Sequence, residues 1–418
     1  MREMKNSGMV WIGEIPNHWK VEKFKYHMKR NEKKNRPDAT VLSLYRELGI
    51  IPKDSRDDNH NVTSEDTSKY KFVEIGNFVV NKMKAWQGSV AVSDYEGIVS
   101  PAYYVYQFTD TSINKRYLHY LLRGCYKDEF RRMSGGVRIG QWDLPADRLE
   151  NTLILIPPTN EQAKIADFLD DKCVQLDALI SDIQTQIDTL EEIRRSTIAR
   201  AVIKGLITEV SMKDSKIEWV GSVPAHWDIR PLYCYFGERK HKNSLGKEQN
   251  LLSLSYGKIV RKDINTNGGL LPASFNTYNI IEAGDIIIRP TDLQNDKRSL
   301  RTGYAWEHGI ITSAYIALKP IADVNTEYMH YLLHAYDVMK VFYNMGNGVR
   351  QGLNFDEFKR LIVLEPPRKE QDMIVGFLNE KCAEIEAVIA DKKSQLETLN
   401  NYKKSIIFEY VTGKKEVV

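Results

Sequence analysis

The sequence predicts an α+β protein of two similar globular domains joined by two long helices that form an antiparallel coiled coil, with a quasi-twofold internal repeat. Three observations support this. The chain has 418 residues, which is more than one ordinary hydrophobic core holds. Two distinctive motifs each occur twice in the same order. Each copy ends in a long stretch whose apolar residues follow a heptad spacing.

The repeated motifs open and close each copy. WIGEIPNHW at 11–19 returns as WVGSVPAHW at 219–227, and PPTNEQAKIADFLDDKC at 157–173 returns as PPRKEQDMIVGFLNEKC at 366–382. A Tyr-x-His-Tyr-Leu-Leu segment and a Gly-Val-Arg triplet also occur in both copies between these motifs. The intervening stretches 27–99 and 235–311 barely align. The duplicated frame with diverged middles suggests two similar tasks of different specificity.

Each copy shows the same order of predicted elements. A strand-rich block with apolar runs such as 78–80 and 286–288 comes first. A short helix is expected near 114–132 and 325–343, and then a strand at 153–156 and 361–364. A Pro-Pro pair ends each of these last strands, because proline cannot continue a strand ladder.

A long helix is expected after each Pro-Pro pair. Thr159-Asn160-Glu161-Gln162 is a candidate helix start with an acidic first turn. Apolar residues then recur at Leu176, Ile180, Ile183, Ile187 and Leu190, and the second copy has Ile385, Ile389, Lys392, Leu396 and Leu399. At 1.5 Å per residue, about 40–45 residues would give roughly 60–65 Å. Each helix could pack on its own domain, but we favour antiparallel pairing because each helix is longer than a single domain. The predicted segments are 1–158, 159–209, 210–367 and 368–418.

Charge and composition restrict the classes of function. The net charge of +3 is small, but it is uneven: 25 cations against 20 anions in 1–158, and 6 against 10 in 159–209. Two modest phosphate-binding faces are compatible with this distribution. No apolar run reaches the length of a membrane span, so we expect no membrane association. The four cysteines are isolated and the start of the chain has no signal-peptide pattern, which predicts a cytoplasmic protein without a structural metal or disulfides.

No catalytic motif is visible in the sequence. There is no GxGxxG, no phosphate-binding GxxxxGK[ST] and no HExxH. The DNA amino-methyltransferase signature, Asn, Asp or Ser before Pro-Pro-aromatic, fails at both Pro-Pro pairs, where Ile156 and Glu365 precede and Thr159 and Arg368 follow. We therefore expect a protein that is not an enzyme and binds no cofactor of its own.

With these motifs, essentially the whole chain resembles a type I restriction-modification system specificity subunit. The resemblance lies in the Trp-x-Gly-x-x-Pro-x-His-Trp and Pro-Pro-x-x-Glu-Gln-x-x-Ile-x-x-Phe-Leu motifs and in the alternation of repeated and variable blocks. It implies two target recognition domains, each reading one half of a bipartite site in double-stranded DNA, with the coiled coil setting the spacer. It also implies assembly with two methyltransferase subunits, which bind S-adenosylmethionine, and with restriction/translocase subunits.

The divergent blocks contain the candidates for base reading. In the first copy, a polar segment after a strand holds cations, an aromatic ring and an amide, which suit base edges in the major groove. Its candidate residues are Lys82, Lys84, Trp86 and Gln87. The corresponding segment of the second copy offers Arg289, Thr291, Gln294, Lys297 and Arg298. A solvated charged turn is the alternative for any one of these residues.

Repeated residues are expected to serve features that the two half-sites share. Arg138 and Arg350 follow Gly-Val in both copies, with Gln141 and Gln351 nearby, and we expect them to contact DNA phosphates, an internal ion pair being the alternative. The basic stretches 29–34 and 239–242 are either phosphate-facing or merely solvated. The repeated tryptophans and histidines are expected to pack as scaffold rather than stack on DNA: Trp11, His18, Trp19, Trp219, His226 and Trp227.

Overall fold

The computed structural model describes residues 2–34, 36–46, 48–56, 63–64, 66–136, 142–264, 274–291, 293, 300–345 and 352–417. The chain forms two compact units. Unit 1 comprises Met1–Gln184 and Ser394–Val418, and unit 2 comprises Thr185–Lys393. The two long helices, α4 (Thr159–Lys204) and α7 (Arg368–Val411), are therefore each shared between the units. This division differs from the four segments predicted above, which remain a prediction.

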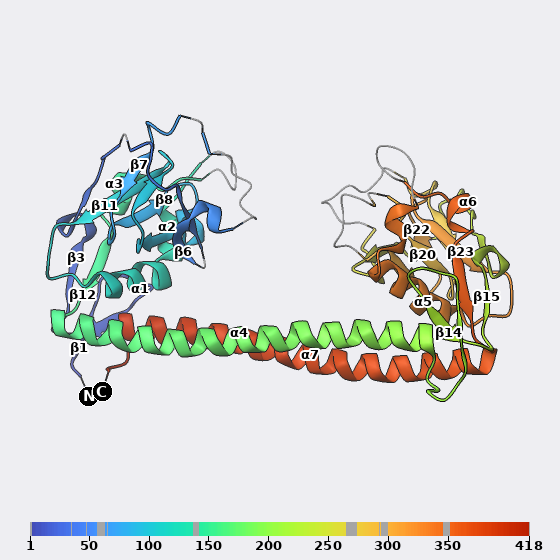
Figure 1. The fold of residues 1–418 in the computed structure, drawn as a ribbon. Helices are drawn as coiled ribbons and strands as arrows, with labels where there is room; N and C mark the ends of the chain where they lie inside the picture. Colours follow the sequence, from blue (N-terminus) through green and yellow to red (C-terminus); the bar gives the residue numbers. More distant parts are fainter. Residues whose placement is uncertain are drawn as a thin grey trace. The chain divides into compact units, whose positions relative to one another are not determined.

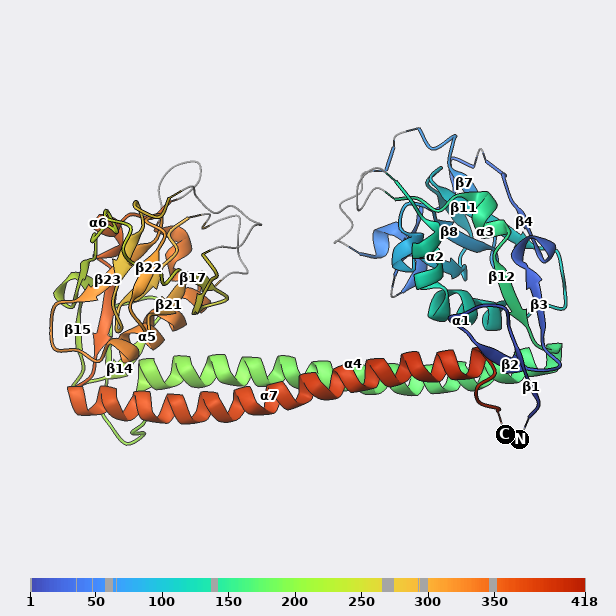
Figure 2. The ribbon, with the colours of Figure 1, turned by 180° about the vertical axis from the view of Figure 1, so that it is seen from behind.

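Unit 1 is built on a four-stranded antiparallel sheet with the order β4-β11-β8-β9. Figure 1 shows β11 and β8, and Figure 2 shows β4 beside them. These strands are β4 (Met28–Arg30), β11 (Tyr103–Phe108), β8 (Phe78–Asn81) and β9 (Val90–Val92). Four strand pairs accompany it: β1 (Met4–Asn6) with β2 (Glu14–Pro16), β3 (Lys20–Lys23) with β12 (Leu153–Ile156), β5 (Leu42–Tyr45) with β6 (Gly49–Pro52), and β7 (Lys71–Val73) with β10 (Gly97–Val99). The short helices are α1 (Lys115–Cys125), α2 (Lys127–Met133), α3 (Ala146–Glu150), η1 (Phe24–Tyr26), η2 (Lys53–Ser55) and η3 (Ala85–Gln87).

Unit 2 repeats this topology, with the sheet order β16-β23-β20-β21. Its strands are β16 (Phe236–Glu238), β23 (Ile316–Pro320), β20 (Ile286–Ile288) and β21 (Thr302–Tyr304). The pairs are β13 (Met212–Asp214) with β14 (Ser222–Pro224), β15 (Asp228–Pro231) with β24 (Ile362–Glu365), β17 (Leu252–Ser255) with β18 (Lys258–Arg261), and β19 (Asn279–Ile281) with β22 (Gly309–Ile311). The short helices are α5 (Thr326–Val338), α6 (Phe355–Phe358), η4 (Leu232–Cys234) and η5 (Val341–Asn344). The predicted α+β duplication is confirmed, and it extends through blocks whose sequences barely align.

Three predicted boundaries need correction. The helix expected over 325–343 ends at Val338, and the separate η5 follows after Lys340, whose φ is +65°. The helix expected over 114–132 is two helices that meet at Tyr126, whose φ of −90° and ψ of 3° are not helical. The strand expected at 361–364 lies one residue later, at Ile362–Glu365. The helix starts themselves follow local chemistry, because the side chains of Asn114 and Asn325 each accept two backbone N–H groups in the first turn.

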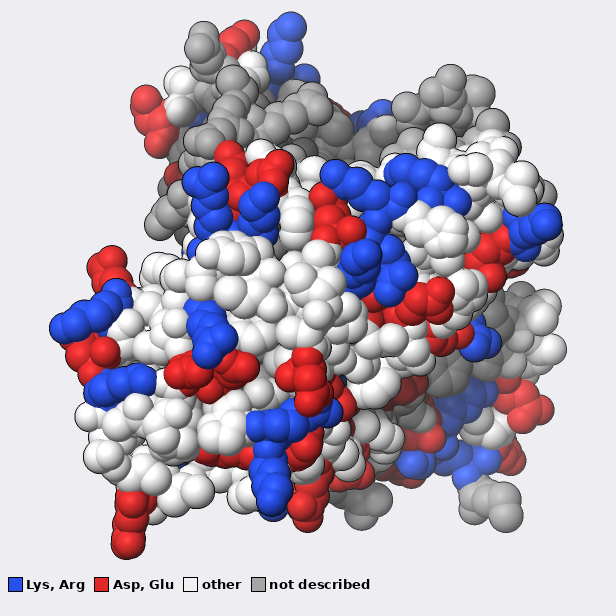
Figure 3. All heavy atoms as spheres, turned by 90° about the vertical axis from the view of Figure 1, so that its right-hand side faces the viewer, with Lys and Arg blue, Asp and Glu red and all other residues white. Residues whose placement is uncertain are grey.

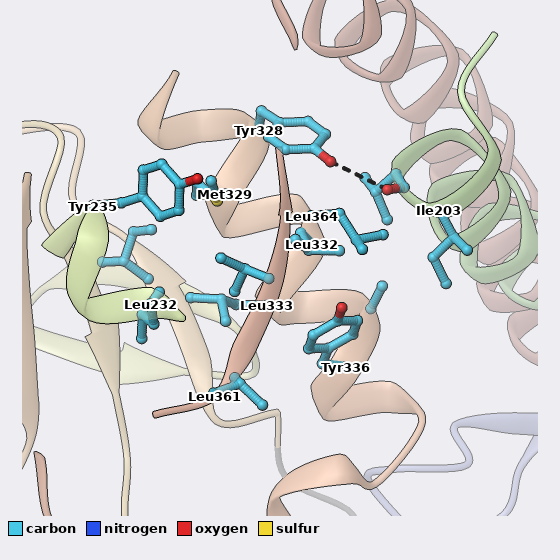
Figure 4. Close-up of a cluster of buried hydrophobic side chains, with 14 of the residues drawn as sticks. Ile203, Leu232, Tyr235, Tyr328, Met329, Leu332, Leu333, Tyr336, Leu361 and Leu364 are labelled. Carbon is cyan, nitrogen blue, oxygen red and sulfur yellow. Dashed lines mark hydrogen bonds between the residues drawn. The ribbon is translucent and has the colours of Figure 1, made fainter. Parts of the chain in front are cut away.

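Each core lies between the sheet, the short helix and the ends of both long helices. In unit 2, Leu332, Leu333 and Tyr336 of α5 point into a cluster with Leu361 and Leu364 (Figure 4). The Tyr328 hydroxyl reaches the Val202 carbonyl near the end of α4 at 3.2 Å (Figure 4). In unit 1 the matching tyrosine, Tyr117, donates to the Val411 carbonyl near the end of α7 at 3.0 Å. The short helix of each unit thus binds the end of the long helix that belongs to the other sequence copy.

Within each unit the long helices run antiparallel. In unit 1 the Phe168 ring lies 4.3 Å from the Tyr410 ring, and Lys403 forms an ion pair with Asp177 at 2.6 Å. In unit 2, Arg194 pairs with Glu386 at 3.0 Å. The predicted seam is the least exposed side, with Leu176, Ile187 and Ile389 buried. Antiparallel pairing is therefore confirmed, and packing of each helix only on its own domain is wrong.

The two repeated motifs meet in one polar cluster. In unit 1, Glu161 in the first turn of α4 accepts a hydrogen bond from the Trp19 indole at 3.0 Å and lies 2.6 Å from His18 Nε2. Partial burial raises the pKa of Glu161, but the hydrogen bonds from Trp19 and His18 outweigh burial and hold that pKa below its usual value. In unit 2, His226 Nε2 lies 2.8 Å from Glu370.

The neighbouring glutamine attaches the short helix to the same point. The Gln162 amide donates to the Pro157 carbonyl at 2.8 Å and accepts the Asn114 N–H at 2.8 Å. Gln371 makes the equivalent bonds to Pro366 and Asn325, both at 2.8 Å. The Glu-Gln pair therefore joins three segments that are distant in sequence, and it does so in both units.

Glycine ends both long helices against the buried tryptophans. Gly205 and Gly413 have φ angles of +73° and +71°. A Cβ atom at Gly413 would lie 2.4 Å from Pro16 Cδ and 3.0 Å from the Trp19 ring, and one at Gly205 would lie 3.1 Å from the Trp227 ring. Both indoles are fully buried, so Trp19 and Trp227 pack as scaffold and cannot stack on a base.

We expect Gly413→Ala to destabilise unit 1. The left-handed backbone costs an L-residue roughly 1–2 kcal/mol, and overpacking adds about 1–3 kcal/mol. Gly8→Ala is the control, because Gly8 has φ +78° with no heavy atom near its Cβ position. Urea unfolding followed by tryptophan fluorescence should show the larger loss for Gly413→Ala. Equal losses would mean that the contact with Trp19 contributes nothing.

We expect Glu161→Gln to lower stability at pH 7 by about 1.5–3 kcal/mol, the usual range for a hydrogen bond to a charged group. Because the folded pKa of Glu161 is depressed, its stabilising effect is present above the unfolded pKa and is lost as the pH falls through the folded value. The difference between wild type and variant should therefore narrow in acid. Glu96→Gln, at an exposed position, is the control. A difference that stayed constant with pH would contradict this role.

Candidate nucleic-acid interface

The loop after β8 is a closed turn that fixes the candidate side chains of unit 1. The Lys84 N–H donates to the Asn81 carbonyl at 2.9 Å, and the Ser89 N–H donates to the Lys84 carbonyl at 3.2 Å. Between them lies η3, which ends at Gly88 with φ +92°. Lys84, Trp86 and Gln87 therefore stand on a short, internally bonded turn rather than on an extended loop.

This turn is attached to the segment that flanks the Gly-Val-Arg loop. The Leu144 N–H donates to the Lys82 carbonyl at 3.0 Å, and Lys82 Nζ pairs with Asp143 at 3.2 Å. The Trp86 and Trp142 rings lie 5.7 Å apart. Arg138 and Gln141 lie outside the described residues, but the residues that flank them contact the turn. Trp142, Asp143 and Leu144, the first described residues after this gap, therefore lie against the turn.

The candidate side chains of the turn differ in whether they already form hydrogen bonds or ion pairs within the unit. Lys82 is held by Asp143, and the Trp86 indole donates to the Met83 carbonyl at 3.1 Å. Lys84 is exposed and forms no hydrogen bond or ion pair with another described residue, and the Gln87 amide likewise bonds to none of them. Lys84 and Gln87 are therefore the groups of this turn with donors and acceptors to offer a ligand, and their role in DNA binding stays a prediction.

A pocket of about 410 Å³ opens beside the same turn. Asn81, Lys84, Tyr45, Tyr70 and Tyr103 are among its lining residues. Burial raises the pKa of Tyr103, against hydrogen bonds with Leu44 and Asn81, so its hydroxyl stays protonated at neutral pH. The turn is thus bordered on one side by a polar, tyrosine-lined hollow.

Unit 2 places its candidate segment by the same backbone contact. The Leu353 N–H donates to the Pro290 carbonyl at 2.9 Å, as Leu144 does to Lys82 in unit 1. Arg289 is half-buried and Thr291 is exposed. The remaining candidates of this unit lie outside the described residues: Gln294, Lys297, Arg298, Arg350 and Gln351.

Sequence reasoning missed Arg301, which supports this segment from inside. Arg301 is fully buried, and its guanidinium donates to the Thr291 carbonyl. Its backbone N–H donates to buried Asp337, whose pKa burial raises to about 6 against opposing effects of Arg301 and Lys340. No local pattern marks Arg301, since it lies in a divergent block and its partners are distant in sequence.

Several cations of the two basic stretches form ion pairs within their own unit. Arg30 pairs with Glu32 at 3.0 Å and Lys33 with Glu74 at 2.6 Å. In unit 2, Arg239 pairs with buried Asp285 at 2.5 Å. Burial still raises the pKa of Asp285, in spite of the Arg239 guanidinium. This pairing favours the solvated interpretation over phosphate contact for these stretches.

The charged groups do not form a single-sign field on the surface that Figure 3 shows. Lys and Arg side chains alternate there with Asp and Glu, among wide uncharged areas (Figure 3). Across the described ranges, no group of three His, Cys, Asp or Glu side chains is arranged to hold a metal ion. No helix among the same residues is long and apolar enough to cross a membrane.

Comparison with known proteins finds similarity to type I restriction specificity proteins. The family model of the type I restriction modification DNA specificity domain matches residues 20–192. A Methanocaldococcus jannaschii protein named as the MjaX type I restriction enzyme specificity subunit is 25% identical over 97% of this chain and 96% of its own. The MjaVIII specificity subunit of the same organism is 27% identical over 52% of each chain.

A solved structure supports the fold across the chain. It comes from a study of complex assembly and conformational transition of the type I R-M system, and it covers 96% of this chain and 99% of its own at 12% identity, with a TM-score of 0.68. The family match covers the first copy of a frame that the structure shows twice, and the full-length relative extends the likeness to the second. Residues 20–192 thus match the type I restriction modification DNA specificity domain, and the chain as a whole is similar in sequence to type I restriction enzyme specificity subunits.

Proposed function

We propose that unit 1 and unit 2 each read one half of a split site in double-stranded DNA and that the paired helices set the spacer between the halves. The observation that supports this most is the pairing of identical anchors with different loops. Leu144 and Leu353 hold the segments after β8 and β20 by the same backbone bond. The segments themselves read NKMKAWQG and RPTDLQND. Different side chains on one frame suit two different base sequences.

The partners follow from the same proposal. Two methyltransferase subunits and restriction/translocase subunits would act at the site that this chain selects, in the cytoplasm. The chain itself would be non-catalytic, and S-adenosylmethionine would bind to the methyltransferase subunits. The missing methyltransferase and nucleotide-binding motifs support this division of labour.

Methylation mapping with an exchange of the first variable block tests the proposal. Co-expressed with its methyltransferase subunit, the chain should produce methylation at a motif of two defined parts separated by an undefined spacer. Replacing residues 27–150 with those of a related specificity subunit should change one part and leave the other part and the spacer intact. The matched control replaces the second variable block, 235–355, and should change the other part. If either exchange altered both parts together, the two-reader proposal would be wrong.

The spacer has its own test in the helices. Inserting one heptad into 176–190 together with one in 385–399 keeps the seam in phase and lengthens both antiparallel partners by about 10 Å. We expect a longer spacer, or loss of methylation, with both half-site sequences unchanged. Methylation mapping reads the outcome directly. An unchanged spacer in an active variant would show that the helices do not set it.

A further inference from the structure

Helix α2 of unit 1 exposes cations that neither the fold nor the predicted recognition residues account for. Its sequence is KDEFRRM, and Phe130 and Met133 bury one face in the unit 1 core. Lys127 and Arg131, four residues apart, lie on one exposed side of the helix. Neither forms a hydrogen bond or ion pair with another described residue. Arg132 differs, because its guanidinium binds Glu129 through two hydrogen bonds of 2.8 and 2.6 Å.

These cations border the candidate recognition turn. The side-chain methylenes of Lys127 lie 3.8 Å from where a Cβ atom of Gly88 would stand, at the end of η3. Lys84, a further cation that forms no hydrogen bond or ion pair with another described residue, directly precedes η3. The three cations Lys84, Lys127 and Arg131, here called the α2 cation set, therefore flank the turn that bears Gln87.

The described residues of unit 2 include no counterpart of the two α2 cations. Between its Tyr-x-His-Tyr helix and its Gly-Val-Arg loop, the place of α2 is taken by η5, whose residues VFYN include no cation. Phe342 of η5 is buried in the core of unit 2, as Phe130 is in unit 1. Lys340 precedes η5 with φ +65°, and its backbone N–H donates to the Asp337 carbonyl. Both units thus bury a phenylalanine of this segment in the core, whereas only unit 1 has cations on the helix itself.

We propose that the α2 cation set binds the DNA phosphates that flank the half-site of unit 1, so that these three residues carry part of the salt dependence of DNA binding. The inference rests on the proposed function. Exposed cations beside a base-reading turn lie where the sugar-phosphate backbone passes when the turn enters a groove, and phosphate contacts position a protein without specifying sequence. Each neutralised phosphate releases condensed counterions, which makes the contact measurable through salt.

The test is DNA binding by the full chain over a range of salt concentrations. Binding to a labelled duplex of arbitrary sequence is measured by fluorescence anisotropy between about 50 and 200 mM NaCl. The double variant Lys127→Gln/Arg131→Gln should reduce the slope of log affinity against log salt by about 1.8, from 0.9 for each phosphate lost. Each single variant should reduce it by about 0.9.

The matched control is Arg132→Gln/Lys340→Gln, which removes the same charge from an ion-paired residue of α2 and from unit 2. The control should change the slope by less than half as much as the double variant does. An unchanged slope in the double variant, or an equal change in the control, would overturn the α2 cation set while leaving the proposed function standing. If the wild-type chain bound no duplex, the proposed function and this inference would both be wrong. Thermal unfolding of each variant confirms that the exposed substitutions leave the fold intact.

Discussion

The contact between the Glu-Gln pair and the His-Trp motif holds the rest of each unit in place. Glu161 lies in the first turn of α4, where a carboxylate is also favoured by the positive end of the helix dipole. Trp19 is buried beside it, and Gly413 closes α7 against the same ring. One small polar cluster therefore connects the motif at 11–19, the start of α4 and the end of α7. Glu370, Trp227 and Gly205 occupy the same positions in unit 2.

Because this cluster lies outside the variable blocks, those blocks can change without loosening the frame. The strand order is the same in both units although 27–99 and 235–311 barely align. The loops after β8 and β20 share one backbone anchor but are supported differently. In unit 1 the support is the Lys82–Asp143 ion pair and the Trp86–Trp142 contact, whereas in unit 2 it is the buried Arg301 guanidinium under Thr291. The two loops can therefore carry different side chains while the same backbone bond keeps them in the same position on the unit.

Internal pairing decides how much of the positive charge remains for a ligand. Arg30, Lys33 and Arg239 belong to conspicuous basic stretches, yet each is held by a carboxylate within its own unit. The exposed pairs of Arg30 and Lys33 are partly screened by solvent and contribute little stability, whereas Arg239 pairs with a buried carboxylate. All three pairs neutralise the cation locally. Other cations form no hydrogen bond or ion pair with another described residue, and Lys84, Lys127 and Arg131 beside the turn after β8 are among them. Fewer positive charges are therefore available to a ligand than the number of lysines and arginines suggests.

The sequence alone determined the duplication, the order of elements, the long helices and their seam, because each of these is written in local periodicity or in repeated motifs. Leu176, Ile187 and Ile389 could be predicted as buried from their heptad spacing. Only the tertiary structure decided which side chains meet. The contact of Lys82 with Asp143 spans 61 residues, and the support of Thr291 by Arg301 depends on a buried site in the divergent block. The break between α1 and α2 at Tyr126 was also invisible, because core packing on both sides of that residue overrides a continuous helical pattern. Pairings of this kind depend on distances set by folding of the whole unit, and no local pattern encodes them.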